Sequence, residues 1–183
     1  MKFLKQFIIK VILLVIGKIP KWKIDNIIFE SIQRNQENKY LGYKNKYNLS
    51  NDFRFNGDDI MLYGEGEITA LANSYIGSYS TIQSVKDKIV RIGHNTRISH
   101  NVRIYTESAV SDQDFSNENL LKKSGNVIIG NYVWIGANVF INPGVEIGDN
   151  SIVGSNSVVN KNIPQNSIFG GVPAKLIKMK TII

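Results

Sequence analysis

Isoleucine or valine returns at every sixth position along two stretches of the chain. The positions are Ile92, Ile98, Ile104 and Val110, and, after a break, Ile129, Ile135, Ile141, Ile147, Val153 and Val159. Neither an α-helix nor a single β-strand has a period of six. The pattern predicts a chain that makes a short strand and then turns, once in every six residues.

The positions between the aliphatic residues repeat as well. A small residue usually comes next, as at Gly93, Ser99, Gly130, Gly136, Gly148 and Gly154. The third residue after the aliphatic one is often asparagine, which tolerates a left-handed backbone at a tight turn; these are Asn95, Asn101, Asn138, Asn150 and Asn156. The fourth is again small or branched, which gives two inward columns. We therefore expect a solenoid of short parallel strands, in which each coil is stable only beside its neighbours.

Two interruptions of the repeat predict surface loops. An earlier coil with Ile76 and Ile82 is followed by a shift in the spacing between Val85 and Val90, which predicts a small outward loop. The segment 111–126 is too polar to form a coil and is expected to project from the solenoid.

The first fifty residues predict a separate, helical segment with a connector. The run from Phe3 to Gly17 is apolar, but Lys5 and Lys10 interrupt it, and a membrane span needs roughly 20 apolar residues. No small-residue cleavage site follows the run, so we expect it to be retained rather than removed as a signal peptide. It is expected either to lie on a membrane surface or to pack on the domain or a partner subunit.

A second helix is expected from about Asp25 to about Gln33, followed by a connector over residues 34–51. Residues 51–183 then form the solenoid domain.

Charge and composition narrow the function. The formal net charge is +7, and the basic excess lies within residues 1–50, so the solenoid lacks the distributed basic face that nucleic-acid binding needs. There is no cysteine, and the two histidines are too few for most zinc sites. The composition predicts no metal and no nucleic-acid partner.

Three segments stand out: Val-Trp-Ile-Gly-Ala-Asn-Val at 133–139, Pro-Gly-Val-Glu-Ile-Gly-Asp-Asn at 143–150, and Ile-Phe-Gly-Gly-Val-Pro-Ala-Lys at 168–175. They resemble segments of the hexapeptide-repeat acyltransferases, and most of all of the galactoside, maltose and polysaccharide O-acetyltransferases. The resemblance covers about residues 68–178. It implies an all-β, left-handed parallel β-helix with the N-terminal helical segment and the projecting loop added, and a homotrimer with active sites at its subunit interfaces.

The resemblance also implies an acyl donor and residues that bind it. The donor is acetyl-CoA. Its pantetheine arm is expected along positions matching Ala137, Ser155, Asn160 and Lys161, and its phosphates near Lys175 and Lys178. Small side chains let an extended amide chain lie close, and ammonium groups neutralise phosphate.

Histidine is the residue best suited to take a proton from an acceptor near neutral pH. Only His94 and His100 are present, six residues apart and therefore expected on different faces. We predict His100 as the general base, because the motif 98–101 resembles the catalytic turn of serine acetyltransferases. In the galactoside and maltose branch the histidine comes a few residues after the strand matching 103–105, where this chain has none. Either the base has moved to His100, oriented by Glu107, Asp112 or Asp114, or the protein is not a working transferase.

The function expected from these features is O-acetylation of a sugar in a bacterial surface polysaccharide or its precursor. Two alternatives stay open: N-acetylation of an amino sugar nucleotide, and a β-helix scaffold without activity. The expected location is cytoplasmic, with possible peripheral contact at the inner face of the membrane through the N-terminus.

Overall fold

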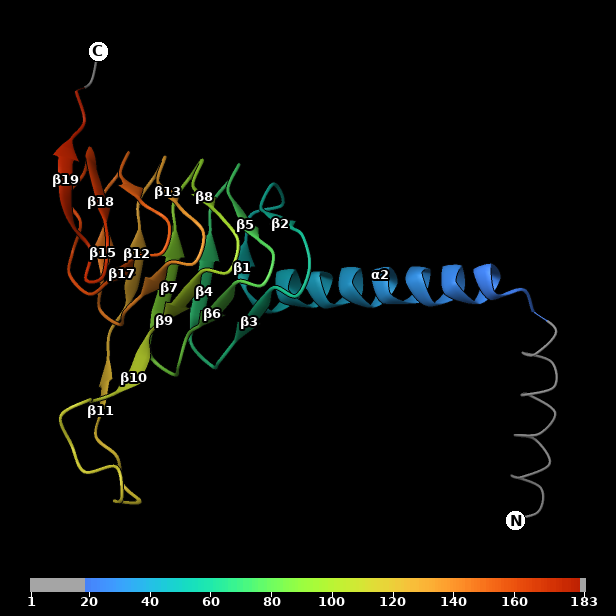
Figure 1. Cartoon of the computed structure of the whole chain (residues 1–183), viewed down its shortest axis with the longest axis horizontal. Helices are drawn as coiled ribbons and strands as arrows, with labels where there is room; N and C mark the ends of the chain where they lie inside the picture. Colours follow the sequence, from blue (N-terminus) through green and yellow to red (C-terminus); the bar gives the residue numbers. More distant parts are fainter. Residues whose placement is uncertain (1–18, 182–183) are drawn as a thin grey trace. The chain divides into compact units, whose positions relative to one another are not determined.

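The computed structural model describes residues 19–181 (Figure 1). The predictions for the apolar run before residue 19 lie outside the described residues. The chain divides into two compact units, residues 1–39 and residues 40–183. Within residues 19–181, no helix is long and apolar enough to cross a membrane.

Helix α2 (Lys21–Lys46) begins directly after Pro20 and is longer than predicted. The prediction that it ends near Gln33 and that a connector follows is wrong, because the helix continues for more than three further turns. Residues 34–46 contain three Lys, which favour helix, but also three Asn and one Gly, which do not, so helix propensity alone does not predict this continuation. Tertiary packing fixes its end: the Tyr40 ring stacks on Phe55 with centroids 4.4 Å apart, and the Tyr40 hydroxyl donates to the Gly57 carbonyl at 2.7 Å.

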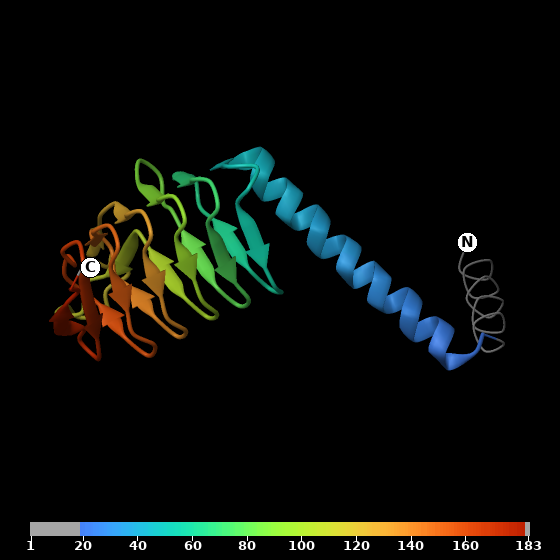
Figure 2. The same ribbon diagram turned by 90° about the horizontal axis from the view of Figure 1, so that it is seen from above.

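The rest of the chain forms a three-sided parallel β-helix, as predicted. Sheet A contains β1 (Asn48–Leu49), β4 (Glu67–Ala70), β7 (Ile89–Ile92), β12 (Val127–Ile129) and β15 (Glu146–Ile147). Sheet B contains β2 (Arg54–Asn56), β5 (Tyr75–Gly77), β8 (Arg97–Ile98), β13 (Trp134–Ile135), β16 (Ile152–Val153), β18 (Ser167–Gly170) and β19 (Lys175–Met179). Sheet C contains β3 (Met61–Tyr63), β6 (Thr81–Gln83), β9 (Arg103–Tyr105), β14 (Phe140–Ile141) and β17 (Val158–Val159). The strands follow one another as successive rungs (Figure 2).

The six-residue repeat explains the core. In sheet B, Ile98 is in register with Ile76 on one side and with Ile135 on the other, and Ile135 is in register with Val153. All four side chains are fully buried. Equivalent columns of buried aliphatic residues run through sheets A and C, so each coil buries its aliphatic side chains against those of the next coil. The solenoid begins earlier than the visible repeat, with a first coil built from β1, β2 and β3.

The asparagines of the repeat lie in the turns between strands, as predicted. Asn95, Asn101, Asn138, Asn150 and Asn156 all have φ between 55° and 59°, in the left-handed region. Three of them also form a ladder along one edge: Asn101 Nδ2 donates to Asn138 Oδ1, and Asn138 Nδ2 donates to Asn156 Oδ1, both at 2.9 Å. The asparagine column therefore shapes each turn and links it to the next coil.

The predicted projecting loop is a β-hairpin of β10 (Glu107–Ala109) and β11 (Lys122–Ser124), paired antiparallel at its base. It leaves the prism between β9 and β12 (Figure 1). The Gln113 side chain holds its two arms together, donating to the carbonyls of Val110 and Leu121 and accepting from the Leu121 amide. The hairpin stays outside the coils because its residues carry too little apolar surface to be buried.

Candidate active site

The edge of the prism between sheets B and C, which we call the B–C edge, contains the turns 77–80, 99–102, 136–139 and 154–157. The second residue of each turn lies in one column: Ser78, His100, Ala137 and Ser155. Backbone bonds tie the column together, from the Asn101 amide to Ser78 O at 2.8 Å and from the Asn138 amide to His100 O at 3.0 Å. Ala137 lies one coil from His100, and Ser155 lies two coils from it. Neighbouring coils are about 4.8 Å apart, the usual spacing of paired strands. The structure thus brings the predicted histidine and two predicted donor-binding residues to one edge.

His100 is exposed, and its ring folds back on the preceding coil. The Ser78 backbone amide donates to His100 Nδ1 at 3.1 Å. Because a backbone N–H can only donate, Nδ1 is an acceptor here, and the neutral imidazole carries its proton on Nε2. Glycine at position 77 leaves space for both the ring and the turn, because a Cβ there would lie 2.9 Å from His100 Nδ1 and 2.9 Å from the Ser99 carbonyl carbon.

His94 lies elsewhere. It is exposed in a turn between sheets A and B, where its backbone amide donates to Asn131 Oδ1 at 2.9 Å and its carbonyl accepts from the Tyr132 amide. The two histidines therefore occupy different edges of the prism, and they cannot act together within one chain.

The other predicted donor-binding residues do not all share the B–C edge. Lys175 begins β19 opposite Gly170 and lies at that edge, whereas Lys178 pairs with Ile168 farther along sheet B. Asn160 and Lys161 follow β17 in the turn between sheets C and A. All four are exposed. A ligand that touches Ser155 and Lys161 in one chain must therefore cross the outer surface of sheet C, or the two groups serve different neighbouring sites of an oligomer.

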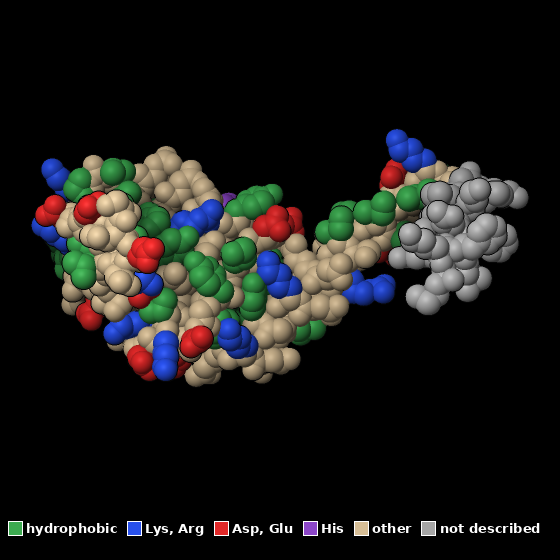
Figure 3. Space-filling view, turned by 90° about the horizontal axis from the view of Figure 1, so that it is seen from below, with side chains coloured by type: hydrophobic (Ala, Val, Ile, Leu, Met, Phe, Trp, Pro, Cys, Tyr) green, Lys and Arg blue, Asp and Glu red, His purple; other side chains and the backbone are tan. Residues whose placement is uncertain are grey.

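The carboxylates considered as partners of His100 belong to the hairpin, which leaves the prism between sheets C and A. Glu107 is paired instead with Lys122, at 3.0 Å. The backbone amide and hydroxyl of Ser116 hold the pKa of Asp114 below its usual value, which makes it a weaker base. All three predicted partners, Glu107, Asp112 and Asp114, belong to this hairpin, so within one chain none of them orients His100. The hairpin side of the molecule carries acidic and basic side chains together (Figure 3).

Two further observations bear on the chemistry. Among the described residues, no group of three or more His, Asp or Glu side chains is placed to hold a metal ion. A hollow of about 710 Å³ lies beside β12 and β15 and is lined by Glu146 and Asp149 but not by His100. His100 and Ser155 are exposed at the B–C edge, so a second surface is needed to enclose a substrate there.

Comparison with known proteins agrees with this fold. The sequence matches the bacterial transferase hexapeptide family (six repeats) over residues 126–161. No curated protein matches the sequence. Among solved structures, a hexapeptide-repeat acetyltransferase from Vibrio cholerae O1 biovar eltor, complexed with acetyl-CoA, has 24% identity and a TM-score of 0.63, over 80% of this chain and 79% of that chain.

Two other structures are similar. A galactoside acetyltransferase in complex with coenzyme A has 33% identity and a TM-score of 0.56, over 70% of this chain and 66% of that one. An N-acyltransferase from Bacillus cereus, bound to dTDP-4-amino-4,6-dideoxyglucose and coenzyme A, has 22% identity and a TM-score of 0.60, over 73% of this chain and 80% of that one.

The repeat and the three-sided prism define the class as hexapeptide-repeat β-helix proteins. Together with the similarity to the galactoside enzyme, they show that this chain belongs to the hexapeptide-repeat acyltransferases.

Proposed function

We propose that this protein transfers an acetyl group from acetyl-CoA to a hydroxyl of a sugar, in a bacterial surface polysaccharide or its precursor, with His100 as the general base. The observation that carries the proposal is the column of His100, Ala137 and Ser155 along the B–C edge. The similar galactoside acetyltransferase was solved with coenzyme A, which supports the choice of donor.

The donor is proposed to lie along this edge. Ala137 and Ser155 are small, and the column leaves room for an extended amide chain beside the turns. Lys175, exposed at the far end of the same edge, places an ammonium group where the phosphates of coenzyme A would end. Asn160, Lys161 and Lys178 are proposed to contact the donor across a subunit interface.

A homotrimer supplies the second surface that the exposed B–C edge needs. We propose that the sheet C side or the hairpin of one subunit faces the B–C edge of its neighbour. In that arrangement the hairpin carboxylates, which are distant from His100 within one chain, approach the histidine of another subunit.

In O-acetylation the acceptor hydroxyl attacks the thioester carbonyl. His100 takes the hydroxyl proton, the C–O bond forms, the C–S bond breaks, and the proton passes to the departing thiolate. The free nitrogen lone pair that this step needs is bound to the Ser78 amide in the described conformation. Turning the exposed ring away costs about one hydrogen bond, or about 0.5–1.5 kcal/mol, which is small beside a catalytic barrier.

The same hydrogen bond favours a second candidate, N-acetylation of an amino sugar nucleotide. A neutral amine attacks the thioester without prior deprotonation, and its proton passes to the coenzyme A thiolate as the C–S bond breaks. In that reaction His100 needs only to donate a hydrogen bond from Nε2 to the developing oxyanion. The tautomer described above has its proton on Nε2, as this role requires.

Glutamine at position 100 separates the two roles, because its amide donates a hydrogen bond but is not a base. If His100 is a base, His100→Gln and His100→Ala lose activity equally, by roughly 100-fold or more. If it is a donor, His100→Gln keeps clearly more activity than His100→Ala. The measurement is the rate of coenzyme A release with matched amino and hydroxy forms of one sugar nucleotide, and unequal variants with a hydroxyl acceptor would contradict the base role.

We also propose peripheral membrane contact through the N-terminal segment, which would bring the enzyme to a lipid-linked acceptor. In the described part of residues 1–23, helix α2 exposes Trp22, an aromatic residue suited to a membrane–water boundary. The full chain is expected to float with anionic liposomes and a chain lacking residues 1–23 is not. Equal flotation of the two chains would contradict this proposal.

A further inference from the structure

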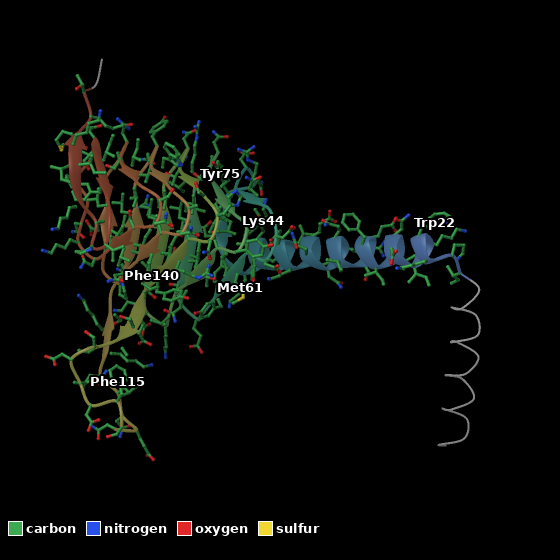
Figure 4. All side chains as sticks on the ribbon, viewed as in Figure 1. Trp22, Lys44, Met61, Tyr75, Phe115 and Phe140 are labelled. Atoms are coloured by element: carbon green, nitrogen blue, oxygen red, sulfur yellow. The ribbon has the colours of Figure 1, made fainter. Side chains whose placement is uncertain are left out.

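The outer surface of sheet B carries a row of side chains that the proposed transfer reaction does not use. Parallel pairing places six residues side by side across the sheet; in order they are Arg54, Tyr75, Arg97, Trp134, Ile152 and Ile168. The residue that follows each of the first five in its strand is aliphatic or aromatic and points inward. Tyr75 lies on the side of the prism opposite Phe140 and Met61 (Figure 4).

The first four members alternate between a cation and an aromatic ring. Arg54 and Arg97 are exposed, and the Trp134 side chain is 52% exposed although it is large and apolar. The Arg54 guanidinium lies 5.9 Å from the centre of the Tyr75 ring. Strands are spaced by about 4.8 Å, so the two arginines are about 10 Å apart along the row, with one ring between them and another beyond.

The row is basic and has no acidic member. Within residues 19–181, neither Arg54 nor Arg97 forms an ion pair with a carboxylate. A guanidinium that is exposed and unpaired is well suited to bind an external carboxylate with two parallel hydrogen bonds.

A hollow of about 300 Å³ lies at the centre of the row, lined in part by Arg97, Tyr132, Trp134 and Lys180. Lys180 is held in place by its Nζ, which donates to the carbonyl and side-chain oxygens of Asn150, each at 2.6 Å. An ammonium has three hydrogens, so one remains beyond these two bonds. The hollow therefore offers aromatic surface between two cationic groups that come from different coils.

We propose that this row binds an extended acidic glycan, in which about every second sugar carries a carboxylate. The arginines bind the carboxylates, and the intervening sugars pack their C–H faces on Tyr75 and Trp134. A strand-to-strand row suits a polymer because its groups recur at a constant spacing. The glycan would run along the axis of the prism, on a sheet that borders the B–C edge where His100 lies.

The proposal deepens the proposed function, since it names an acidic polysaccharide as the acceptor class, but its test requires no catalysis. The probe is a set of hyaluronan oligosaccharides, in which uronate and neutral sugars alternate, titrated into the full-length protein by calorimetry without acetyl-CoA. Binding is expected to weaken as salt is raised, and neutral dextran is expected not to bind. Failure of the acetyl transfer reaction would leave this binding unchanged.

Matched variants locate the site. Arg97→Ala and Trp134→Ala are each expected to weaken hyaluronan binding by about tenfold or more, since the first removes a charge-assisted hydrogen bond and the second removes the aromatic face against which a sugar packs. Arg91→Ala removes an exposed arginine from the outer surface of sheet A and is expected to change the affinity by less than about twofold.

The proposal would be overturned if hyaluronan did not bind, or if Arg91→Ala and Arg97→Ala weakened its binding equally. It would also be overturned if dTDP bound to the same residues more tightly than hyaluronan, or if Trp134→Ala changed the oligomeric mass. The last, measured by light scattering, would show that the row is a contact between subunits.

Discussion

Replacing His100 with alanine is expected to lower kcat for acetyl transfer to a sugar hydroxyl by roughly 100-fold or more, the usual size of a general-base contribution. The KM for acetyl-CoA should change little, because the donor is proposed to lie against Ala137, Ser155 and Lys175 and not on the imidazole. The rate of coenzyme A release at saturating acetyl-CoA measures the effect.

His94→Ala is the matched control, since it removes the other histidine from a different edge of the prism. It is expected to keep full activity. If His94→Ala were as inactive as His100→Ala, or if His100→Ala kept its activity, the assignment of the B–C edge as the catalytic edge would be wrong.

Ile135→Ala is expected to lower the free energy of unfolding by about 2–5 kcal/mol, the cost of a large-to-small change in a packed core. Ile135 is fully buried and lies in register between Ile98 and Val153, so the cavity would open between three successive coils. Urea unfolding followed by circular dichroism measures the loss.

The same substitution at Ile177, whose side chain is 65% exposed, is the control and should change stability by no more than about 0.5 kcal/mol. Comparable losses in the two variants would contradict the account of the core as a stack of inward aliphatic columns.

The solenoid could be predicted from the sequence because its information is local and repeated. Each coil places an aliphatic residue inward and an asparagine at a left-handed turn, so Ile98 and Asn101 already define the local geometry that Ile135 and Asn138 repeat one coil later. The first coil was not visible in the repeat, because Phe53, Leu62 and Ile60 fill it at irregular spacing.

The helix boundary and the orientation of His100 could not be predicted in the same way. The polar end of helix α2 is held by Tyr40 on Phe55, a contact between residues that the sequence pattern does not connect. The Ser78–His100 hydrogen bond joins residues 22 positions apart. Gly77 does not signal it, because the backbone of the next coil also excludes a Cβ there, as it does at Gly93 and Gly136.

Only some of the predicted donor-binding residues lie at the same edge of the prism. Ala137, Ser155 and Lys175 lie together at the B–C edge, while Asn160 and Lys161 lie in the turn between sheets C and A. A sequence motif shows which residues follow one another along the chain. It does not show which residues meet across a subunit interface, because that depends on how the surfaces of the subunits pack.

The most direct test of the central claim is acceptor-dependent release of coenzyme A from acetyl-CoA, followed with a thiol reagent across a panel of sugars and sugar nucleotides. The protein has no cysteine, so it does not react with the reagent itself. The account predicts saturable release that requires both the protein and a sugar acceptor. Acetyl-CoA binding without release for any polysaccharide, hydroxy sugar or amino sugar in the panel would contradict it and would favour a β-helix that has kept its fold without its activity.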